Sequence, residues 1–260
     1  MDWTTKRKFA YLSIVASIIG LIIIYFVYQL FFTAEATCFD KKKNQGERGV
    51  DCGGVCQLVC PADVRPLVPL WTRPLKITGD IYSVVSLVEN QNAGNGVKSI
   101  PYEIRMYDER NILIGEPIVG KTFIGPNDRT AIFETAVKTN GIEPKTAFLR
   151  FLENPVFYRT DPVYANQNII SSRDVMTDLD TVPKLSVDIT NVADKNFPRF
   201  PVVVIIYDTE GNALATSQTI VDSLAIEETK TLYFSWPEPF SGTPARRDII
   251  PKINPFPNEL

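Results

Sequence analysis

The sequence predicts a mainly β protein with an N-terminal transmembrane helix, a small disulfide module and two tandem β-sandwiches. Three observations carry this prediction: one long uncharged apolar segment near the N-terminus, four cysteines within 23 residues, and a strand pattern that occurs twice at an offset of about 101 residues. The chain has 260 residues, of which 45% are hydrophobic and 11% aromatic, so it holds enough apolar material for two sandwich cores.

The first element is a membrane anchor over residues 9–34. No charged residue falls in this segment, and the 22 residues of Tyr11–Phe32 are apolar almost throughout. As a helix these residues reach about 33 Å, enough to cross a hydrocarbon core of about 30 Å. The alternative is a cleaved signal peptide, with Lys6-Arg7-Lys8 as its basic region and Ala34-Glu35-Ala36 as its cleavage site, but the apolar regions of signal peptides span only about 7–15 residues. We therefore expect an uncleaved helix that contacts membrane lipid through residues 9–34.

All four cysteines, Cys38, Cys52, Cys56 and Cys60, fall in a Gly- and Asp-rich stretch that is too short for a hydrophobic core. An even number of clustered cysteines favours a disulfide module over residues 38–60, and the choice among its three possible pairings stays open. A zinc site of four thiolates normally uses C-x2-C pairs, whereas the spacings here are x13, x3 and x3. Zinc binding and free thiols are the two alternatives.

The cysteines also decide the orientation of the anchor. Basic residues flank the apolar segment on both sides, so the positive-inside count is nearly tied. Disulfides, however, persist only in oxidising compartments. We expect residues 1–8 to form a cytoplasmic tail and everything after Ala34 to be extracytoplasmic, which makes this a single-pass protein of the cell membrane.

The segment Asn44–Cys56 resembles a DCGG cysteine module that recurs in surface proteins of bacteria, archaea and some animals. Its GE-x-GVDCGG core carries the resemblance. Oxygen ligands for calcium are available from Asp40, Asn44, Glu47 and Asp51, but three adjacent lysines at positions 41–43 oppose a dication. We expect turn-forming, solvated side chains and no metal site here, with calcium binding as the alternative.

The remainder of the chain alternates with period two, as half-buried strands do. Four prolines between residues 61 and 74 predict an extended connector that reaches Leu75 before the strands begin. The segment Val202–Tyr207 is apolar on both faces, which predicts a central strand covered on both sides. Other expected strands are Pro101–Tyr107, Leu185–Thr190, Thr231–Trp236, a last strand from Arg246, and a segment in which Ala131, Phe133, Thr135 and Val137 share one face.

The strand pattern is duplicated. Asn90 precedes Tyr107 by 17 residues, and Asn191 precedes Tyr207 by 16 residues. Phe133 follows Tyr107 by 26 residues, as Phe234 follows Tyr207 by 27. This repetition predicts a first β-sandwich over residues 67–160, a linker over residues 161–182 and a second β-sandwich over residues 183–260.

These residues carry a second resemblance. Ile104–Asp108 and Val204–Asp208 look like the hydrophobic-x-hydrophobic-Tyr-Asp strand end of FxLyD-type domains. The whole chain resembles single-pass membrane proteins of candidate-phylum bacteria, which combine an anchor, a DCGG module, such sandwiches and an FxWPxPF-like segment, here Phe234–Phe240. The resemblance implies immunoglobulin-like sandwiches and no particular activity, because this fold hosts many functions.

Catalytic chemistry has no candidate in this sequence. It contains no histidine, which removes the commonest general base, and no S-x-x-K, G-x-S-x-G or Walker pattern. Asp108 and Asp208 follow the Tyr-ending strands, where we expect them to form hairpin turns. Trp71 and Trp236 are expected in a core or at a domain junction rather than stacked on a ligand. We expect no enzyme, no catalytic residue, no cofactor and no small-molecule substrate.

The expected function is that of a tether or docking module. The net charge of −3 gives no electrostatic reason for a nucleic acid partner. We expect a membrane-anchored, extracytoplasmic, non-enzymatic protein that serves as a structural spacer or protein-interaction module at the cell surface. Exposed edge strands suit docking, so a protein partner of open identity is expected. The alternative is an accessory ectodomain subunit of an envelope complex for secretion, pilus assembly or transport.

Overall fold

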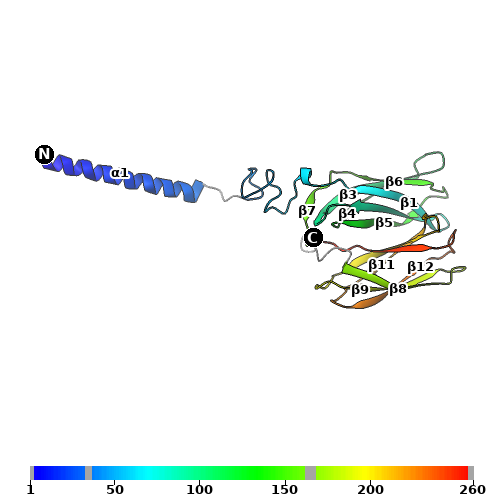
Figure 1. Cartoon of the computed structure of the whole chain (residues 1–260). Helices are drawn as coiled ribbons and strands as arrows, with labels where there is room; N and C mark the ends of the chain where they lie inside the picture. Colours follow the sequence, from blue (N-terminus) through cyan, green and yellow to red (C-terminus); the bar gives the residue numbers. More distant parts are fainter. Residues whose placement is uncertain (1–2, 33–36, 162–167, 257–260) are drawn as a thin grey trace. The chain divides into compact units, whose positions relative to one another are not determined.

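The computed structural model describes residues 3–32, 37–161 and 168–256, and the chain divides into two compact units, Met1–Cys56 and Gln57–Leu260 (Figure 1). Strands make up 47% of the chain and helices 12%, which confirms the predicted mainly β class. Those parts of the predicted segments that fall on residues 1–2, 33–36, 162–167 and 257–260 lie outside the described residues.

The N-terminal helix α1 runs from Trp3 to Phe32. Within it, the candidate membrane span is Arg7–Gln29, whose most apolar 18-residue window has a mean hydropathy of 2.5 and is not buried inside the protein. Such a helix reaches about 35 Å, so it is long and apolar enough to span a membrane. It begins before residue 9 because the basic segment Lys6–Lys8 is helical as well.

Turns rather than regular elements shape the cysteine-rich segment that follows. Gly53 and Gly54 both have positive φ angles, 70° and 58°. A Cβ atom on Gly54 would lie 2.1 Å from the carbonyl oxygen of Gly46, a distance at which no side chain fits. The backbone therefore requires glycine in the DCGG sequence.

The first β-sandwich consists of two antiparallel sheets whose facing sides enclose one hydrophobic core. One sheet has the strand order β1-β2-β5, and the other has the order β4-β3-β6, with β7 paired to β3. Val84, Ile104 and Ile132 are among its fully buried core residues. The elements are the short 3-10 helix η1 (Pro61–Asp63) and the strands β1 (Val68–Thr78), β2 (Ile81–Asn90), β3 (Asn95–Tyr107), β4 (Ile118–Ile124), β5 (Asp128–Lys138), β6 (Thr146–Phe151) and β7 (Phe157–Arg159).

The proline-rich connector is shorter than predicted. Strand β1 begins at Val68, so two of the prolines, Pro69 and Pro74, lie inside a strand. Both are tolerated because β1 is an edge strand, where a missing N–H on the unpaired side leaves the ladder intact. The expectation of an extended connector as far as Leu75 was therefore wrong beyond residue 67.

The second β-sandwich repeats the first. Its sheets have the strand orders β12-β9-β8 and β11-β10-β13. Strand for strand, β8–β13 therefore correspond to β1–β6, which confirms two tandem sandwiches. The strands are β8 (Ile169–Thr177), β9 (Lys184–Asn191), β10 (Phe200–Tyr207), β11 (Ala213–Val221), β12 (Thr229–Ser235) and β13 (Arg246–Pro251).

The segment predicted as a linker contains the first strand of the second sandwich. Strand β8 lies within residues 161–182 and pairs with β9, from Ile169 opposite Asn191 to Thr177 opposite Lys184. A register shift between Ser172 and Val175, together with a positive φ of 46° at Arg173, interrupts its alternation. Most of β8 is also exposed, so hydrophobic periodicity gave little signal for it.

A third hydrophobic core joins the two sandwiches. The outer face of the β1-β2-β5 sheet packs on the outer face of the β11-β10-β13 sheet, and Figure 1 shows the resulting stack of layers. In β10, Val202, Val204 and Ile206 enter the core of the second sandwich, whereas alternate residues enter the core between the sandwiches. This confirms the prediction that Val202–Tyr207 is covered on both sides. The core between the sandwiches contains Leu75, Val85, Leu87, Ala131, Val203, Ile205, Tyr207 and Ile250.

The predicted equivalence of Phe133 and Phe234 was wrong by one position. Phe133 pairs with Val85 and packs between the sandwiches, whereas Phe234 lies in the core of the second sandwich. The residue equivalent to Phe133 is Tyr233, because a slip of one residue moves a strand side chain to the opposite face. A bulge before Val137 likewise turns that residue into the first core, so it does not share a face with Phe133.

Candidate functional site

The four predicted disulfide cysteines are all oxidised. Cys38 is bonded to Cys56 with an S–S length of 2.00 Å and a Cα–Cα distance of 5.6 Å, and Cys52 and Cys60 are also disulfide-bonded. Three of the four are buried, whereas Cys38 is half-buried. The structure therefore confirms the disulfide module and selects the Cys38–Cys56 pairing.

Polar side chains of the module hold its loop backbone. Asp40 accepts the N–H of Lys42 at 2.8 Å, and Asp51 accepts the N–H of Lys41 at 3.1 Å. The hydrogen bond from the Asn44 side chain, together with those from backbone amides, lowers the pKa of Asp40. The carboxylates of Asp40 and Asp51 thus serve as turn acceptors, as expected, whereas Glu47 is buried and not solvated as predicted.

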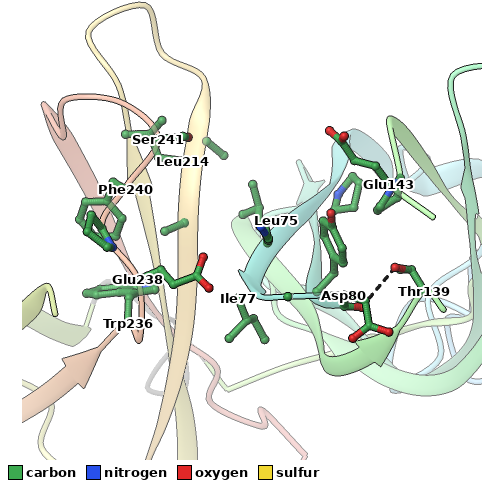
Figure 2. A pocket seen from close by; sticks show the side chains of 18 of the residues that line it. Leu75, Ile77, Asp80, Thr139, Glu143, Leu214, Trp236, Glu238, Phe240 and Ser241 are labelled. Carbon is green, nitrogen blue, oxygen red and sulfur yellow. Dashed lines mark hydrogen bonds between the residues drawn. The ribbon is translucent and has the colours of Figure 1, made fainter. Parts of the chain in front are cut away.

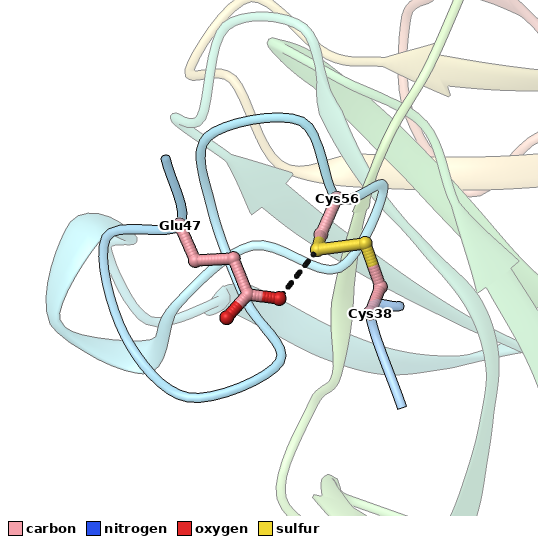
Figure 3. A group of neighbouring side chains, drawn as sticks. All are labelled: Cys38, Glu47 and Cys56. Carbon is pink, nitrogen blue, oxygen red and sulfur yellow. Dashed lines mark hydrogen bonds between the residues drawn. A yellow bond between two sulfur atoms is a disulfide. The ribbon is translucent and has the colours of Figure 1, made fainter. Parts of the chain in front are cut away.

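Glu47 lies buried against the Cys38–Cys56 bond (Figure 3). Its Oε1 is 3.2 Å from Sγ of Cys56, and its Oε2 accepts the N–H groups of Asn44 and Asp51 at 3.2 and 3.3 Å. In the described part of the chain, Cys38, Glu47 and Cys56 form the one group of acidic and cysteine side chains close enough together to hold a metal ion. The two sulfur atoms are bonded to each other, so the oxidised group offers no thiolate ligand. Sequence reasoning considered Glu47 only as a calcium ligand and missed this contact.

A groove of about 560 Å³ lies between the two sandwiches, and Figure 2 shows the side chains that face each other across it. Leu75 and Ile77 of β1 lie on one side, and Leu214 of β11, Trp236 and Phe240 lie on the other. The rings of Trp236 and Phe240 meet edge to face with their centroids 5.2 Å apart. Ligand pockets of proteins have a volume of this order, and polar atoms make up more of the surface of this groove than apolar atoms do.

Acidic side chains outnumber basic ones around the groove. Asp80, Glu143 and Glu238 line it, against a single cation, Lys76. The hydrogen bond and charge of Lys145 lower the pKa of Glu143, which keeps that group ionised at neutral pH. Glu238 accepts the hydroxyl of Thr78 at 2.6 Å, a bond that joins the two sandwiches. The arrangement suits the binding of apolar and basic groups.

The two tryptophans considered in the sequence have structural roles. Trp71 packs at the junction of the sandwiches, edge to face with Tyr207 at a centroid distance of 6.3 Å. Trp236 belongs to the second core, and its Nε1 donates to the carbonyl oxygen of Thr216 at 3.0 Å. The predictions of a junction and a core position are confirmed. The groove itself was missed, because it arises only when the two sandwiches dock.

The recurrent aspartates form hairpin turns, as predicted. Asp108 accepts the N–H groups of Arg110 and Ile112 at 2.9 and 2.8 Å. Asp208 accepts those of Glu210 and Asn212 at 2.9 and 2.7 Å, and these bonds lower its pKa. Each carboxylate is occupied by its own turn.

The recurrent asparagines brace the ends of equivalent strands. Asn90 is 1% exposed and donates to the carbonyl oxygens of Asn95 and Gly125. Asn191 is fully buried and donates to those of Lys195 and Ala225. Each side-chain oxygen also accepts the N–H two residues later. These residues therefore fix loops rather than bind a ligand.

The two outermost sheet faces carry ion networks, at positions where the equivalent faces between the sandwiches carry apolar residues. On the β4-β3-β6 face, Oε1 of Glu103 lies 3.0 Å from Nε of Arg105 and 2.9 Å from Nη2 of Arg150. On the β12-β9-β8 face, Asp188 binds Arg173 at 2.5 Å and Thr231 at 2.6 Å. The equivalent positions in the joined faces carry apolar residues: Val203 and Ile205 replace Glu103 and Arg105, and Leu87 replaces Asp188.

A buried amine ties the end of the chain to the first sandwich. Nζ of Lys252 donates to Oγ1 of Thr122 at 2.6 Å. Burial lowers the pKa of Lys252 to about 8, although the nearby carboxylate of Glu134 opposes the change. Glu134 itself accepts the hydroxyl of Tyr102 at 2.5 Å. Neither Lys252 nor Glu134 was predicted to be a site residue, because an isolated charged residue in a strand, such as Glu134, or just after one, such as Lys252, resembles a surface position.

No protein-family model and no curated protein matches this chain. Among solved structures it is similar to a red sea bream transglutaminase, with 10% identity over 72% of this chain and 29% of that one and a TM-score of 0.25. It is also similar to Bacteroides uniformis β-glucuronidase 2, with 12% identity over 65% and 23% of the chains and a TM-score of 0.20. The third similar structure is the C-terminal globular domain of a Pyrococcus abyssi oligosaccharyltransferase. It has 11% identity over 72% of this chain and 46% of that one, with a TM-score of 0.20. The chain thus spans less than half of each of these proteins, and likenesses at such TM-scores carry no argument about function.

Proposed function

We propose that this chain is a membrane-anchored, extracytoplasmic and non-enzymatic protein, in which two rigidly joined β-sandwiches serve as a spacer and interaction module at the cell surface. Helix α1 supplies the anchor, with residues 1–8 on the cytoplasmic side. The oxidised cysteines support an extracytoplasmic location for everything after Ala34, because disulfides form and persist in oxidising compartments.

The single observation that carries the spacer role is the core between the sandwiches. Val85, Val203 and Ile205 are each exposed by 1% or less, as in the interior of a single domain. Domains that are joined only by a linker are expected to move against each other, whereas a large apolar contact holds them together. A rigid body of this kind keeps a binding surface on one sandwich in a fixed position relative to the other sandwich.

A non-enzymatic role is supported by what the conspicuous polar residues do. Asp108, Asp208, Asn90 and Asn191 hold their own turns and loops, and Glu238 in the groove accepts the Thr78 hydroxyl. Each of these groups has a structural partner, so none is left poised to take a proton from a substrate.

The groove favours a second candidate, an accessory ectodomain subunit of an envelope complex. Its excess of carboxylates, beside apolar side chains such as Leu214 and Phe240, fits a partner segment with basic and apolar side chains. Sedimentation of the detergent-extracted protein distinguishes the two: a monomer supports the spacer, and a stoichiometric complex that dissociates when Leu214 is changed to Glu supports the subunit. The change Gln218→Glu, at an exposed position of the same strand, is the matched control.

Fusions to two reporters test the proposed topology. Alkaline phosphatase folds only where its own disulfides form, whereas green fluorescent protein exported in unfolded form stays dark. We expect a C-terminal phosphatase fusion to be active and the corresponding fluorescent fusion to be dark. The reverse result would place the sandwiches in the cytoplasm and overturn the proposal.

A further inference from the structure

The Cys38–Cys56 bond has a buried carboxylate beside it. Glu47 is 5% exposed and Cys56 is 1% exposed, and Oε1 of the first lies 3.2 Å from Sγ of the second (Figure 3). All three residues belong to the same compact unit. Two backbone N–H groups bind the other oxygen, Oε2, so the carboxyl group is fixed in this position rather than placed there by chance.

Glu47 and Cys56 can form a hydrogen bond only when the disulfide is reduced. A disulfide sulfur carries no hydrogen, so in the oxidised form two lone-pair-bearing atoms face each other without a donor. In the dithiol form, the S–H of Cys56 points a proton at Oε1 of Glu47, and 3.2 Å is well within the range of a sulfur hydrogen bond. The site therefore favours the reduced form of this bond more than surroundings without an acceptor would.

The exposure of the two cysteine residues is suited to exchange. Cys38 is half-buried, whereas Cys52, Cys56 and Cys60 are exposed by only 8%, 1% and 7%. A thiolate from outside can reach Cys38 more readily than any other cysteine of the module. Attack at Cys38 makes Cys56 the leaving group, and Cys56 is the sulfur that contacts Glu47.

We propose that the Cys38–Cys56 bond is a thiol–disulfide exchange site and that Glu47 accepts a hydrogen bond from the Cys56 thiol in the reduced form. A thiolate of a dithiol reductant attacks Sγ of Cys38, the S–S bond breaks, and Cys56 leaves as a thiolate that takes a proton from water; the resulting S–H then donates to Oε1 of Glu47. The second thiolate of the reductant then attacks its own mixed disulfide, and Cys38 leaves and takes a proton from water. The reductant loses two electrons and becomes a disulfide.

Oxidation follows the same path in reverse. Water takes the proton of the Cys56 thiol, and the resulting thiolate attacks the mixed disulfide at Cys38. The module thus contains one exchange-active bond, whereas Cys52 and Cys60 keep a structural role. This inference goes beyond the spacer function and does not depend on it.

The first test uses the unmodified full-length protein in detergent. It is equilibrated with increasing dithiothreitol and alkylated, and the modified cysteines are identified by mass spectrometry. We expect Cys38 and Cys56 to be alkylated as a pair at reductant levels that leave Cys52 and Cys60 unmodified. Reduction of all four cysteines together, or of Cys52 and Cys60 first, would overturn the proposal.

The second test isolates the hydrogen bond. Glu47→Gln keeps the shape of the side chain and an oxygen for the amides, but it offers the Cys56 thiol an amide acceptor in place of a carboxylate, which is the stronger acceptor. We therefore expect the dithiothreitol concentration at which half of the Cys38–Cys56 bond is reduced to rise about threefold or more. The matched control is Asp51→Asn, which removes the same charge from the same module at a positive φ that Asn tolerates. Its half-reduction concentration should stay within about twofold of that of the parent. Equal half-reduction concentrations for the parent and Glu47→Gln would contradict the role of Glu47.

Discussion

Arg105 and Ile205 occupy equivalent positions of the two sandwiches, two residues before a Tyr-Asp strand end, but Ile205 is fully buried whereas the Arg105 side chain is 41% exposed. Ile205 faces the other sandwich, and Arg105 lies on the outer face, where it contacts Glu103. The duplicated domain therefore has a joining version and a terminal version of the same sheet face. Repeat proteins use polar outer faces in the same way to end a stack.

A charge placed in the core between the sandwiches should lower the stability of the protein. Ile205→Arg places an unpaired cation among apolar residues, so we expect the free energy of unfolding to fall by about 3 kcal/mol or more. Ile205→Val, which removes one methyl group, should cost about 1 kcal/mol. Denaturant titration followed by the fluorescence of Trp71, which packs at the junction, measures both changes. A loss below about 1 kcal/mol for Ile205→Arg would show that the sandwiches are not held by this core.

The ion network on the first outer face should prevent end-to-end association. Replacing Glu103 with Val and Arg105 with Ile recreates the residues of the joined face, so we expect concentration-dependent oligomers in sedimentation velocity. The matched control makes the same type of change at the exposed ion pair of Asp222 and Arg199. If this variant stays monomeric like its control, the ion network of Glu103 and Arg105 does not prevent association of the outer face.

Lys252 should make stability depend on alkaline pH. Its pKa is about 8 in the folded chain and about 10.5 when unfolded, so between these values the unfolded state binds more protons. Stability should therefore rise as the pH increases from about 8 to 9.5, by about 1 kcal/mol. Lys252→Met should remove this rise, whereas Lys145→Met, at an exposed lysine, should keep it. Identical pH profiles for the parent and Lys252→Met would contradict the assignment.

Asn191 should be among the most sensitive polar residues. Its side chain is fully buried and serves loop carbonyls as well as an amide, so Asn191→Ala leaves several backbone groups without a partner. We expect a loss of about 3 kcal/mol in the free energy of unfolding. Gln218→Ala, at an exposed position, should change it by less than about 0.5 kcal/mol. Comparable values for the two variants would refute the bracing role.

Most individual strands could be predicted from the sequence, but the way the sheets and sandwiches pack together could not. Alternation identified most strands, and Val202–Tyr207 even revealed a strand that is covered on both sides. Strand β8 was missed because exposure and a bulge remove its periodicity, and Phe133 was matched to the wrong partner because a one-residue slip changes faces. The cysteine spacing predicted the disulfides. The contact of Glu47 with Cys56 could not be predicted because it depends on the turns of an irregular loop, and the groove could not because it depends on how the two sandwiches dock.

Selective thiol labelling of intact cells tests the central claim most directly. A membrane-impermeant maleimide is added with and without prior treatment by a membrane-impermeant reductant, and the four cysteines are read by mass spectrometry. An oxidised module outside the membrane predicts labelling of all four only after reduction. Labelling of all four in a fresh lysate without any reductant, or no labelling of reduced intact cells, would contradict a disulfide-bonded, extracytoplasmic module.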